Sequence, residues 1–234
     1  SATHTDPSVL DAVVSLAEAQ RHQWALDVGT GTGHTALAMA PQVHAVVGCD
    51  VTPEMLAEAR GLAAGRGISN VHWHLADAHA LPYCAGGFQV VTCRRAAHHF
   101  LDVAVALAEM ARVLAPGGRL VIDDRSAPED DEVEAIQHTL DCLHDPSHVR
   151  QFRPSAWAAL LQQAGFRLEA SIPYVQHRPI GSFTDLLPRE QAQPIRAILT
   201  GLSARARELM GVRMVDGTLF SNHWYMLLAA TRGG

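Results

Sequence analysis

The sequence predicts an α/β protein in which helices cover both faces of a mostly parallel sheet. Over the first 125 residues, short apolar runs alternate with segments whose apolar residues recur at helical spacing. Turns containing glycine or proline separate these segments. Because parallel strands need crossover connections, this alternation is typical of a doubly wound sheet, in which ligands bind beyond the carboxyl ends of the strands.

The expected elements follow from these patterns. Val103, Leu107, Met110 and Leu114 have the spacing of a buried helix face, and Pro116-Gly117-Gly118 then predicts a tight turn. The second half is less regular and ends on a predicted helical insertion before the last strand. The predicted strands are 24–28, 43–49, 71–75, 88–93, 119–122, 168–175 and 220–230, and the later helices are 132–143, 157–164 and 187–210.

Length and composition fit one domain. The chain has 234 residues, of which 48% are hydrophobic and 18% charged, enough apolar residues for a sizeable core. We expect a single domain over 1–234, with a core of about 22–176 and 220–231 and a small helical cap from 1–20 and 177–219. The net charge of −6 and the lack of a long Lys/Arg cluster argue against a nucleic-acid partner.

The cysteines and the hydropathy pattern bear on location. Cys49, Cys84, Cys93 and Cys142 show no C-x-x-C spacing, which predicts reduced, buried thiols in a cytoplasmic protein. The N-terminus has no signal-peptide pattern, and no apolar stretch approaches the length of a membrane span. A monomer and a homodimer both fit the sequence.

A glycine-rich segment carries the strongest functional signal. The run from Ala25 to Gly33 is an apolar strand that leads into three glycines at alternate positions and then into a helix. Glycines let the backbone turn sharply and approach a ligand closely. The spacing is G-x-G-x-G, whereas the dinucleotide fingerprint is G-x-G-x-x-G. This favours S-adenosylmethionine (SAM) over NAD, and the alternative is a turn that only joins strand to helix.

Acidic residues follow the next two strands. A carboxylate at Asp50 can accept hydrogen bonds from both ribose hydroxyls of an adenosine, or else cap the helix that begins at Thr52-Pro53. Asp77 could accept from the adenine amino group, with the Ala78 backbone beside the ring. The alternative for Asp77 is an ordinary turn.

Five segments in this order resemble the class I SAM-dependent methyltransferases, and are most similar to the group that includes the ubiquinone/menaquinone-biosynthesis C-methyltransferases and many small-molecule methyltransferases. They cover about half of the chain, and DPSHVRQF (145–152) and SAWAALLQQAGF (155–166) match only in outline. The five segments are LDVGTGTG (26–33), GCDVTPEML (48–56), ADAHALPY (76–83), FQVVTCRRAAHHF (88–100) and RVLAPGGRLVIDD (112–124).

This resemblance implies a Rossmann-like, doubly wound sheet of seven strands, with the last strand antiparallel and inserted between the fifth and sixth. It implies that Asp27 and the glycine loop flank the methionine part of SAM, that Asp50 holds the ribose, and that Arg94 contributes its backbone near the amino group. The implied cofactor-binding residues are Asp27, Gly29, Thr30, Gly31, Gly33, Asp50, Val51, Asp77, Ala78 and Arg94.

Catalytic candidates follow the fourth strand. His98 or His99 could act as a general base if the acceptor must lose a proton, and otherwise they pack or bond the cofactor loop. His98 is favoured, because Phe100 and Leu101 suggest that the chain is then returning to the core. Arg94-Arg95 could meet an acidic substrate or be structural. We expect no metal, either at Asp123-Asp124 or at the two histidines of His72-x-His74.

The sequence therefore predicts an enzyme that transfers a methyl group from SAM to a small-molecule acceptor and releases S-adenosylhomocysteine. Two alternatives stay open: a SAM-fold protein that catalyses a rearrangement or elimination, and a non-catalytic SAM-binding partner subunit. The atom that is methylated, whether O, N, C or S, is left undetermined.

Overall fold

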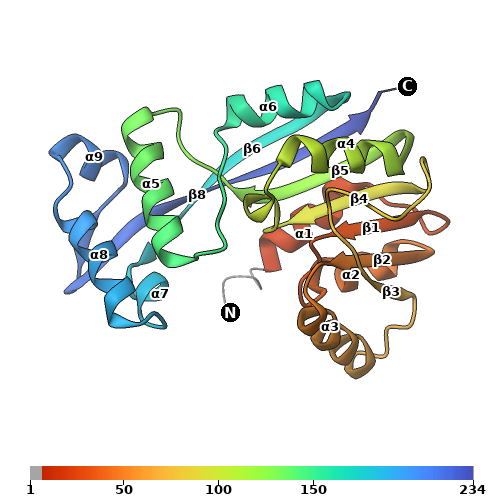
Figure 1. The fold of residues 1–234 in the computed structure, drawn as a ribbon, viewed down its shortest axis with the longest axis horizontal. Helices are drawn as coiled ribbons and strands as arrows, with labels where there is room; N and C mark the ends of the chain where they lie inside the picture. Colours follow the sequence, from red (N-terminus) through yellow and green to blue (C-terminus); the bar gives the residue numbers. More distant parts are fainter. Residues whose placement is uncertain (1–6, 234) are drawn as a thin grey trace.

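The computed structural model describes residues 7–233 and shows an α/β fold around one twisted sheet (Figure 1). The strand order is β3-β2-β1-β4-β5-β8-β6, and β7 pairs with β8. Neighbours from β3 to β5 are parallel, whereas β8 runs antiparallel to both β5 and β6. The strands are β1 (Trp24–Val28), β2 (Ala45–Asp50), β3 (Val71–Leu75), β4 (Phe88–Arg94), β5 (Leu114–Arg125), β6 (Phe166–Pro179), β7 (Arg213–Val215) and β8 (Thr218–Arg232).

Local signals in the sequence start several of the helices. The Asp102 side chain accepts hydrogen bonds from the Ala104 and Val105 amides and so caps α4. Asp130 caps α5 in the same way, through the Val133 amide. The helices are α1 (Pro7–Ala17), α2 (His34–Met39), α3 (Pro53–Gly65), α4 (Val103–Val113), α5 (Asp131–His144), α6 (Pro154–Gln163), α7 (Gly181–Thr184), α8 (Arg189–Thr200) and α9 (Ala204–Leu209), with 3-10 turns η2 (Ala40–Gln42) and η3 (Ala97–His99).

Helices cover both faces of the sheet, as the sequence predicted. Val90 and Val91 are consecutive in β4 and belong to different clusters of buried side chains, because successive strand residues point to opposite faces. One cluster includes Met110 of α4 and Trp157 of α6, and the other includes Val13 of α1. Full burial of one such aliphatic side chain contributes about 1.5–3 kcal/mol, so the two layers hold the strand ends in fixed positions.

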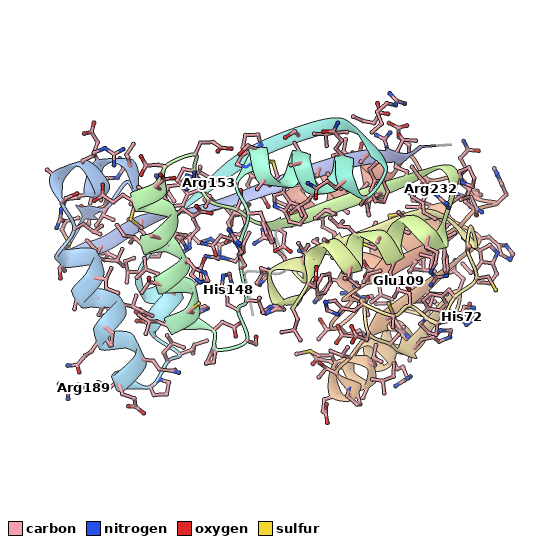
Figure 2. The ribbon with its side chains drawn as sticks, turned by 45° about the horizontal axis from the view of Figure 1, so that its top comes forward. His72, Glu109, His148, Arg153, Arg189 and Arg232 are labelled. Atoms are coloured by element: carbon pink, nitrogen blue, oxygen red, sulfur yellow. The ribbon has the colours of Figure 1, made fainter. Side chains whose placement is uncertain are left out.

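A second group of helices lies at the far end of the two longest strands. The pairing of β6 with β8 continues to Pro179 and Phe220, whereas the pairing of β5 with β8 stops at Arg125 and Tyr225. On this extension α5, α7, α8 and α9 gather (Figure 1), with Leu140, Phe183, Ile195 and Leu199 in one buried cluster. His148 lies where this group meets the rest of the molecule (Figure 2).

Three details differ from the prediction. The described residues contain eight strands rather than seven, because the segment before β8 forms the short strand β7. Leu114 begins β5 instead of continuing α4, and the predicted turn at 116–118 is an irregularity in the pairing of β4 with β5. Cys84 and Cys142 are exposed, whereas Cys49 and Cys93 are buried as expected; all four are free thiols.

The segments at 187–210 and 1–6 were both expected to belong to a helical cap. The predicted insertion at 187–210 is helical, in the form of α8 and α9. Residues 1–6 of the expected cap lie outside the described part of the chain. Among the residues that are described, none of the helices combines the length and the apolar character that crossing a membrane requires.

Candidate active site

The residues that the sequence singled out gather at the carboxyl ends of the parallel strands. Val28 at the end of β1 pairs with Cys49 of β2, and Arg94 at the end of β4 pairs with Asp123 of β5. The loops that leave these strands therefore begin side by side. This is the edge at which open α/β sheets bind ligands.

Glycine is needed at three positions of the loop after β1 for different structural reasons. Gly31 has a φ of +52°, and a Cβ built on it would meet no atom of the described residues within 4 Å. Gly33 has a φ of +83°, and its Cβ would stand 2.4 Å from the Trp73 ring. A Cβ on Gly29 would stand 2.4 Å from that of Ala96. Gly29 and Gly33 are thus required by the protein's own packing, and Gly31 presents open backbone.

Asp27 lies beneath this loop. Its carboxylate is buried and accepts hydrogen bonds from the hydroxyls of Thr30 at 2.6 Å and Thr92 at 2.7 Å. Burial raises the pKa of this carboxyl, although the two hydroxyl bonds and the charge of Arg94 act against the increase. Asp27 therefore holds the loop through Thr30.

Asp50 links the glycine loop to the next helix. One carboxylate oxygen, Oδ2, accepts from the Gly31 amide at 2.8 Å, and Oδ1 accepts from the Thr52 amide at 2.9 Å. Asp50 is thus fixed beside the glycine loop, whereas the N-cap position of α3 belongs to Thr52 and has no side-chain capping bond. Each oxygen keeps acceptor capacity, since an ionised carboxylate has about four lone-pair sites. Val51, next to it, is 63% exposed although apolar.

The loop after β3 is closed by a histidine that sequence reasoning missed. Asp77 Oδ1 accepts from the backbone amide of His79 at 2.9 Å and from its Nδ1 at 2.6 Å. These bonds lower the pKa of Asp77. The His79 Nε2 accepts from the Asp102 amide at 3.1 Å, so this ring ties the loop of Asp77 and buried Ala78 to the loop after β4.

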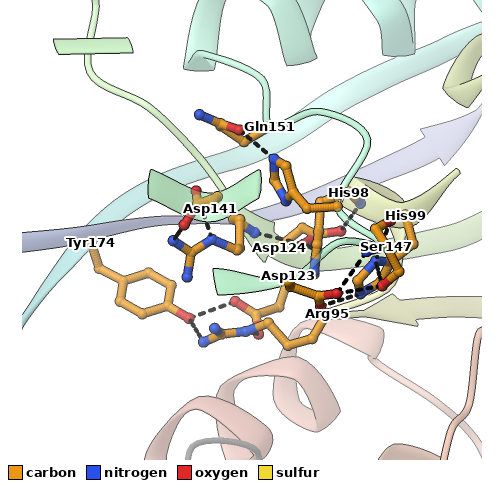
Figure 3. A network of polar contacts seen from close by, with 12 residues as sticks. Arg95, His98, His99, Asp123, Asp124, Asp141, Ser147, Gln151 and Tyr174 are labelled. Atoms are coloured by element: carbon orange, nitrogen blue, oxygen red, sulfur yellow. Dashed lines mark hydrogen bonds and ion pairs between the residues drawn. The ribbon is translucent and has the colours of Figure 1, made fainter. Parts of the chain in front are cut away.

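The two arginines after β4 have different partners. Arg94 is half-buried, and its Nε donates to the Thr35 hydroxyl at 2.9 Å. Arg95 has a φ of 55°, a strained conformation for a residue with a side chain. Its Nε donates to Asp123 Oδ2 at 2.8 Å, and its NH2 group donates to the Tyr174 hydroxyl at 2.9 Å (Figure 3).

His98 and His99 point to different surroundings. They lie in the turn η3, where His98 is buried and its Nδ1 donates to Asp124 Oδ1 (Figure 3). The pKa of Asp124 lies below its ordinary value: burial alone would raise it, but His98, the Arg125 amide and the charge of Arg95 together lower it. The His99 Nδ1 instead donates to the Ser147 carbonyl at 3.1 Å.

The expectation that the chain returns to the core after His99 holds for Phe100 and is wrong for Leu101. Phe100 packs against the core, whereas Leu101 is 86% exposed. Leu101 directly precedes Asp102, which caps α4, so the chain is still outside the helix at this point. The different orientations of His98 and His99 come from the 3-10 turn and the two loops that it contacts.

The segment 145–152 packs against the histidine turn, which sequence reasoning did not foresee. The amides of Val149 and Arg150 donate to the His98 carbonyl at 2.8 and 3.1 Å. The His148 ring lies 5.5 Å from that of His98, and its Nε2 donates to Gln151 Oε1 at 2.7 Å. The available signal was the DPSHVRQF segment, in which a histidine follows three turn-forming residues.

The other histidine pair has ordinary partners. The His72 ring stacks on Trp24, and His74 Nδ1 lies 3.3 Å from the Tyr83 hydroxyl. Asp123 and Asp124 are occupied by Arg95 and His98. Within residues 7–233 no three His, Cys, Asp or Glu side chains are grouped as metal ligands.

A doubly wound sheet with β8 reversed between β5 and β6, and with these loops at one edge, defines a Rossmann-like methyltransferase fold. Residues 26–122 match the family model described as a methyltransferase domain. The chain is 42% identical over 151 residues to an uncharacterized methyltransferase, YcgJ, of Bacillus subtilis, covering 64% of this chain and 60% of that protein. It thus spans less than two thirds of that relative.

Two further comparisons extend over more of the molecule. A demethylmenaquinone methyltransferase of Deinococcus radiodurans is 36% identical over 177 residues, which cover 67% of this chain and 72% of that protein. The crystal structure of YcgJ from Bacillus subtilis superposes with a TM-score of 0.93 at 31% identity, covering 97% of this chain and 99% of that one. The chain belongs to the class I methyltransferase family.

Proposed function

We propose that this protein binds SAM and transfers its methyl group to a small-molecule acceptor, releasing S-adenosylhomocysteine. The observation that carries the proposal is the pairing of Asp50 with Gly31 at the open part of the glycine loop. An acidic side chain fixed against exposed glycine backbone is suited to an adenosyl group, whose ribose offers two hydroxyl donors.

The residues at the strand ends fit such a cofactor. The position of a Gly31 side chain is open, the Asp50 oxygens retain acceptor capacity, and Val51 offers an exposed apolar surface for a flat ring. Gly29, Thr30, Gly33 and Asp27 would shape and hold the loop, and Asp77, Ala78 and Arg94 complete the binding set. When bound, SAM supplies a methyl group on a sulfonium, which is already activated for displacement.

The contribution of the protein to the reaction is then alignment and proton removal. Holding two reactants in line removes much of the entropic barrier. In its neutral form His98 carries a proton on Nδ1, which Asp124 accepts in a hydrogen bond, so Nε2 remains as the base. Among the described residues Nε2 has no hydrogen-bond partner. We assign His98 as the general base and Asp124 as its positioning residue, with His99 supporting the turn.

The proposal also covers the methyl acceptor, the cap, the cellular location and the oligomeric state. The Deinococcus relative is named for demethylmenaquinone, and the negative net charge disfavours nucleic acid, so we propose a small molecule as the acceptor. We propose that 177–219, together with 1–20, form a cap over the acceptor within one domain of 1–234, although α1 itself packs on one face of the sheet. We further propose a cytoplasmic enzyme, in keeping with its four free thiols, and a monomer or homodimer.

Calorimetry tests the cofactor assignment. Purified protein is titrated with S-adenosylhomocysteine, with SAM and with NADH under the same conditions. We expect both sulfur nucleosides to bind and NADH to bind far more weakly. Binding of NADH without binding of either sulfur nucleoside would contradict the proposal.

A further inference from the structure

Three arginine side chains surround one tyrosine ring where β5 ends and β6 and β8 continue. The Cζ atom of Arg95 lies 3.7 Å from the centroid of the Tyr225 ring, that of Arg125 lies 5.6 Å away, and that of Arg178 lies 5.9 Å away. They come from the loop after β4, from the end of β5 and from β6. Three positive charges are therefore concentrated around a single buried ring.

Two of these charges are balanced by carboxylates. Arg95 is paired with Asp123, and Arg125 donates through both Nε and NH2 to Asp141. Both carboxylates are buried and already accept these bonds, and Asp123 also accepts from the Tyr174 hydroxyl at 2.6 Å. The negative charges of Asp123 and Asp141 are therefore already paired with Arg95 and Arg125.

Arg178 has no such partner in the part of the chain that the structure describes. Its NH2 group donates to the neutral Gln176 amide oxygen, and no carboxylate of residues 7–233 lies within 4.0 Å of its guanidinium. The residue is half-buried rather than enclosed. A guanidinium has five N–H donors in a planar fork, which leaves several for a ligand.

The neighbouring titratable groups do not supply the missing negative charge. Burial, followed by the charge of Asp123, raises the pKa of Tyr174, so this phenol stays neutral. The pKa of His223 lies well below its ordinary value because of burial, with the charges of Arg125 and Arg178 adding to the effect. Burial likewise lowers the pKa of His144. Among residues 7–233, Arg178 is therefore the arginine of this cluster that has no carboxylate paired with it.

We propose that the methyl acceptor carries an anionic oxygen group, a carboxylate or a phenolate, and that Arg178 binds it. This rests on the proposed methyl transfer. Arg95, which shares the Tyr225 ring with Arg178, belongs to the same loop as His98. Arg178 therefore shares its ring contact with the loop that carries the proposed base. Planar guanidinium and carboxylate groups form paired, charge-assisted hydrogen bonds.

A matched pair of probes tests this without knowledge of the acceptor. Benzoate and benzamide have nearly the same shape and differ in charge. Each is titrated into the protein with and without S-adenosylhomocysteine, and binding is followed by NMR shifts. We expect benzoate to bind about tenfold or more tightly than benzamide, the scale of hydrogen bonds to a charged group.

Substitutions then test whether Arg178 causes the preference for benzoate over benzamide. Arg178→Gln should abolish the preference for benzoate, whereas the affinity for S-adenosylhomocysteine should change little, because Arg178 is not among the residues proposed to bind the cofactor. Arg178→Lys should keep part of it, because the charge remains while the fork is lost. The control is Arg167→Gln, on the same strand and 74% exposed, which should behave as the wild type. Arg178→Met, which keeps the apolar stem, replaces Arg178→Gln if that variant melts early.

The outcomes are distinct. Equal binding of the two probes, no saturable binding of benzoate at millimolar concentration, or a preference that survives Arg178→Gln would each overturn the proposal. A protein that fails to bind S-adenosylhomocysteine would contradict the proposed function instead. In that case the titration without S-adenosylhomocysteine would still decide whether Arg178 is an anion site.

Discussion

The side chain of Asp124 holds both the ring and the backbone of His98. Its Oδ1 accepts from the imidazole Nδ1, and its Oδ2 accepts from the backbone amide of His98 at 3.1 Å. Asp124 is fully buried at the end of β5, so the turn after β4 is fixed to the neighbouring strand (Figure 3). This arrangement keeps the proton on Nδ1 and leaves Nε2 as the acceptor.

Removing either member of this pair should slow the reaction without weakening cofactor binding. For His98→Ala we expect turnover to fall by about 10²–10⁴-fold, the usual contribution of a general base. Asp124→Asn keeps the shape but can donate to Nδ1, so it should shift the proton to Nε2 and also reduce turnover. Initial rates and calorimetric titration with S-adenosylhomocysteine measure the two effects.

His99→Ala is the matched control for this prediction. His99 neighbours His98 but donates to the Ser147 carbonyl, so its loss should reduce turnover much less. If His98→Ala turned over normally, or if His99→Ala were equally slow, His98 would be a packing residue. The same conclusion would follow from an acceptor that is already a free nucleophile at neutral pH.

Asp50→Ala should weaken binding of S-adenosylhomocysteine by about 1.5–3 kcal/mol, the scale of hydrogen bonds to a charged group. The reason is twofold: the ribose loses its acceptor, and the Gly31 amide loses the bond that fixes the loop. Calorimetry measures the change. Glu58→Gln, an exposed acidic residue of α3, is the control and should bind normally. Unchanged affinity in Asp50→Ala would remove Asp50 from the cofactor site.

Alanine at two glycines of the loop should separate cofactor binding from packing. Gly31→Ala has room for the side chain and meets only backbone strain of about 1–2 kcal/mol, so it should fold and bind S-adenosylhomocysteine poorly. Gly33→Ala also collides with Trp73, so it should be the less stable of the two. Urea unfolding and calorimetry report both quantities. Normal binding by Gly31→Ala would show that the open space there is not used.

The buried His223 predicts how stability depends on pH. Its pKa in the folded protein is well below the ordinary value, chiefly because of burial, so below about pH 6.5 the unfolded chain binds a proton that the folded chain does not. The free energy of unfolding should therefore fall as pH falls below that value, by up to about 1.4 kcal/mol per pH unit for this one group.

Urea unfolding of the wild type and of His223→Gln between pH 5 and pH 7 tests this. The variant should show a shallower slope by about one proton, or about 1.4 kcal/mol per pH unit, whatever its absolute stability. His22→Gln, at an exposed position, should keep the slope of the wild type. Parallel slopes for His223→Gln and the wild type would contradict the account of His223.

The regular part of the fold was predictable because its signals are local. Buried strands such as β1 and β4 are short and mostly apolar, and α4 has a clear helical spacing. β7 was not predictable, since all three of its residues are exposed and show no alternation. Leu114 fits the spacing of the helix before it, but pairing with Phe88 places it in β5.

The candidate site was predictable in position and less so in its contacts. The strand-end rule brings Asp50, Asp77 and His98 to one edge from sequence alone. The link from His79 to Asp102 and the packing of 145–152 on the His98 carbonyl join segments that are distant in sequence and carry no local signal. The unbalanced charge of Arg178 depends on strand register and is equally invisible in the sequence.

The most direct test of the central claim follows methyl transfer itself. Wild-type protein is incubated with methyl-labelled SAM and a panel of small acceptors that includes carboxylates and phenols, and S-adenosylhomocysteine and labelled product are both counted. Methyl transfer requires the two to appear in a ratio of one to one, and His98→Ala should slow both together. An acceptor consumed while SAM stays intact would contradict methyl transfer and identify a rearrangement or elimination.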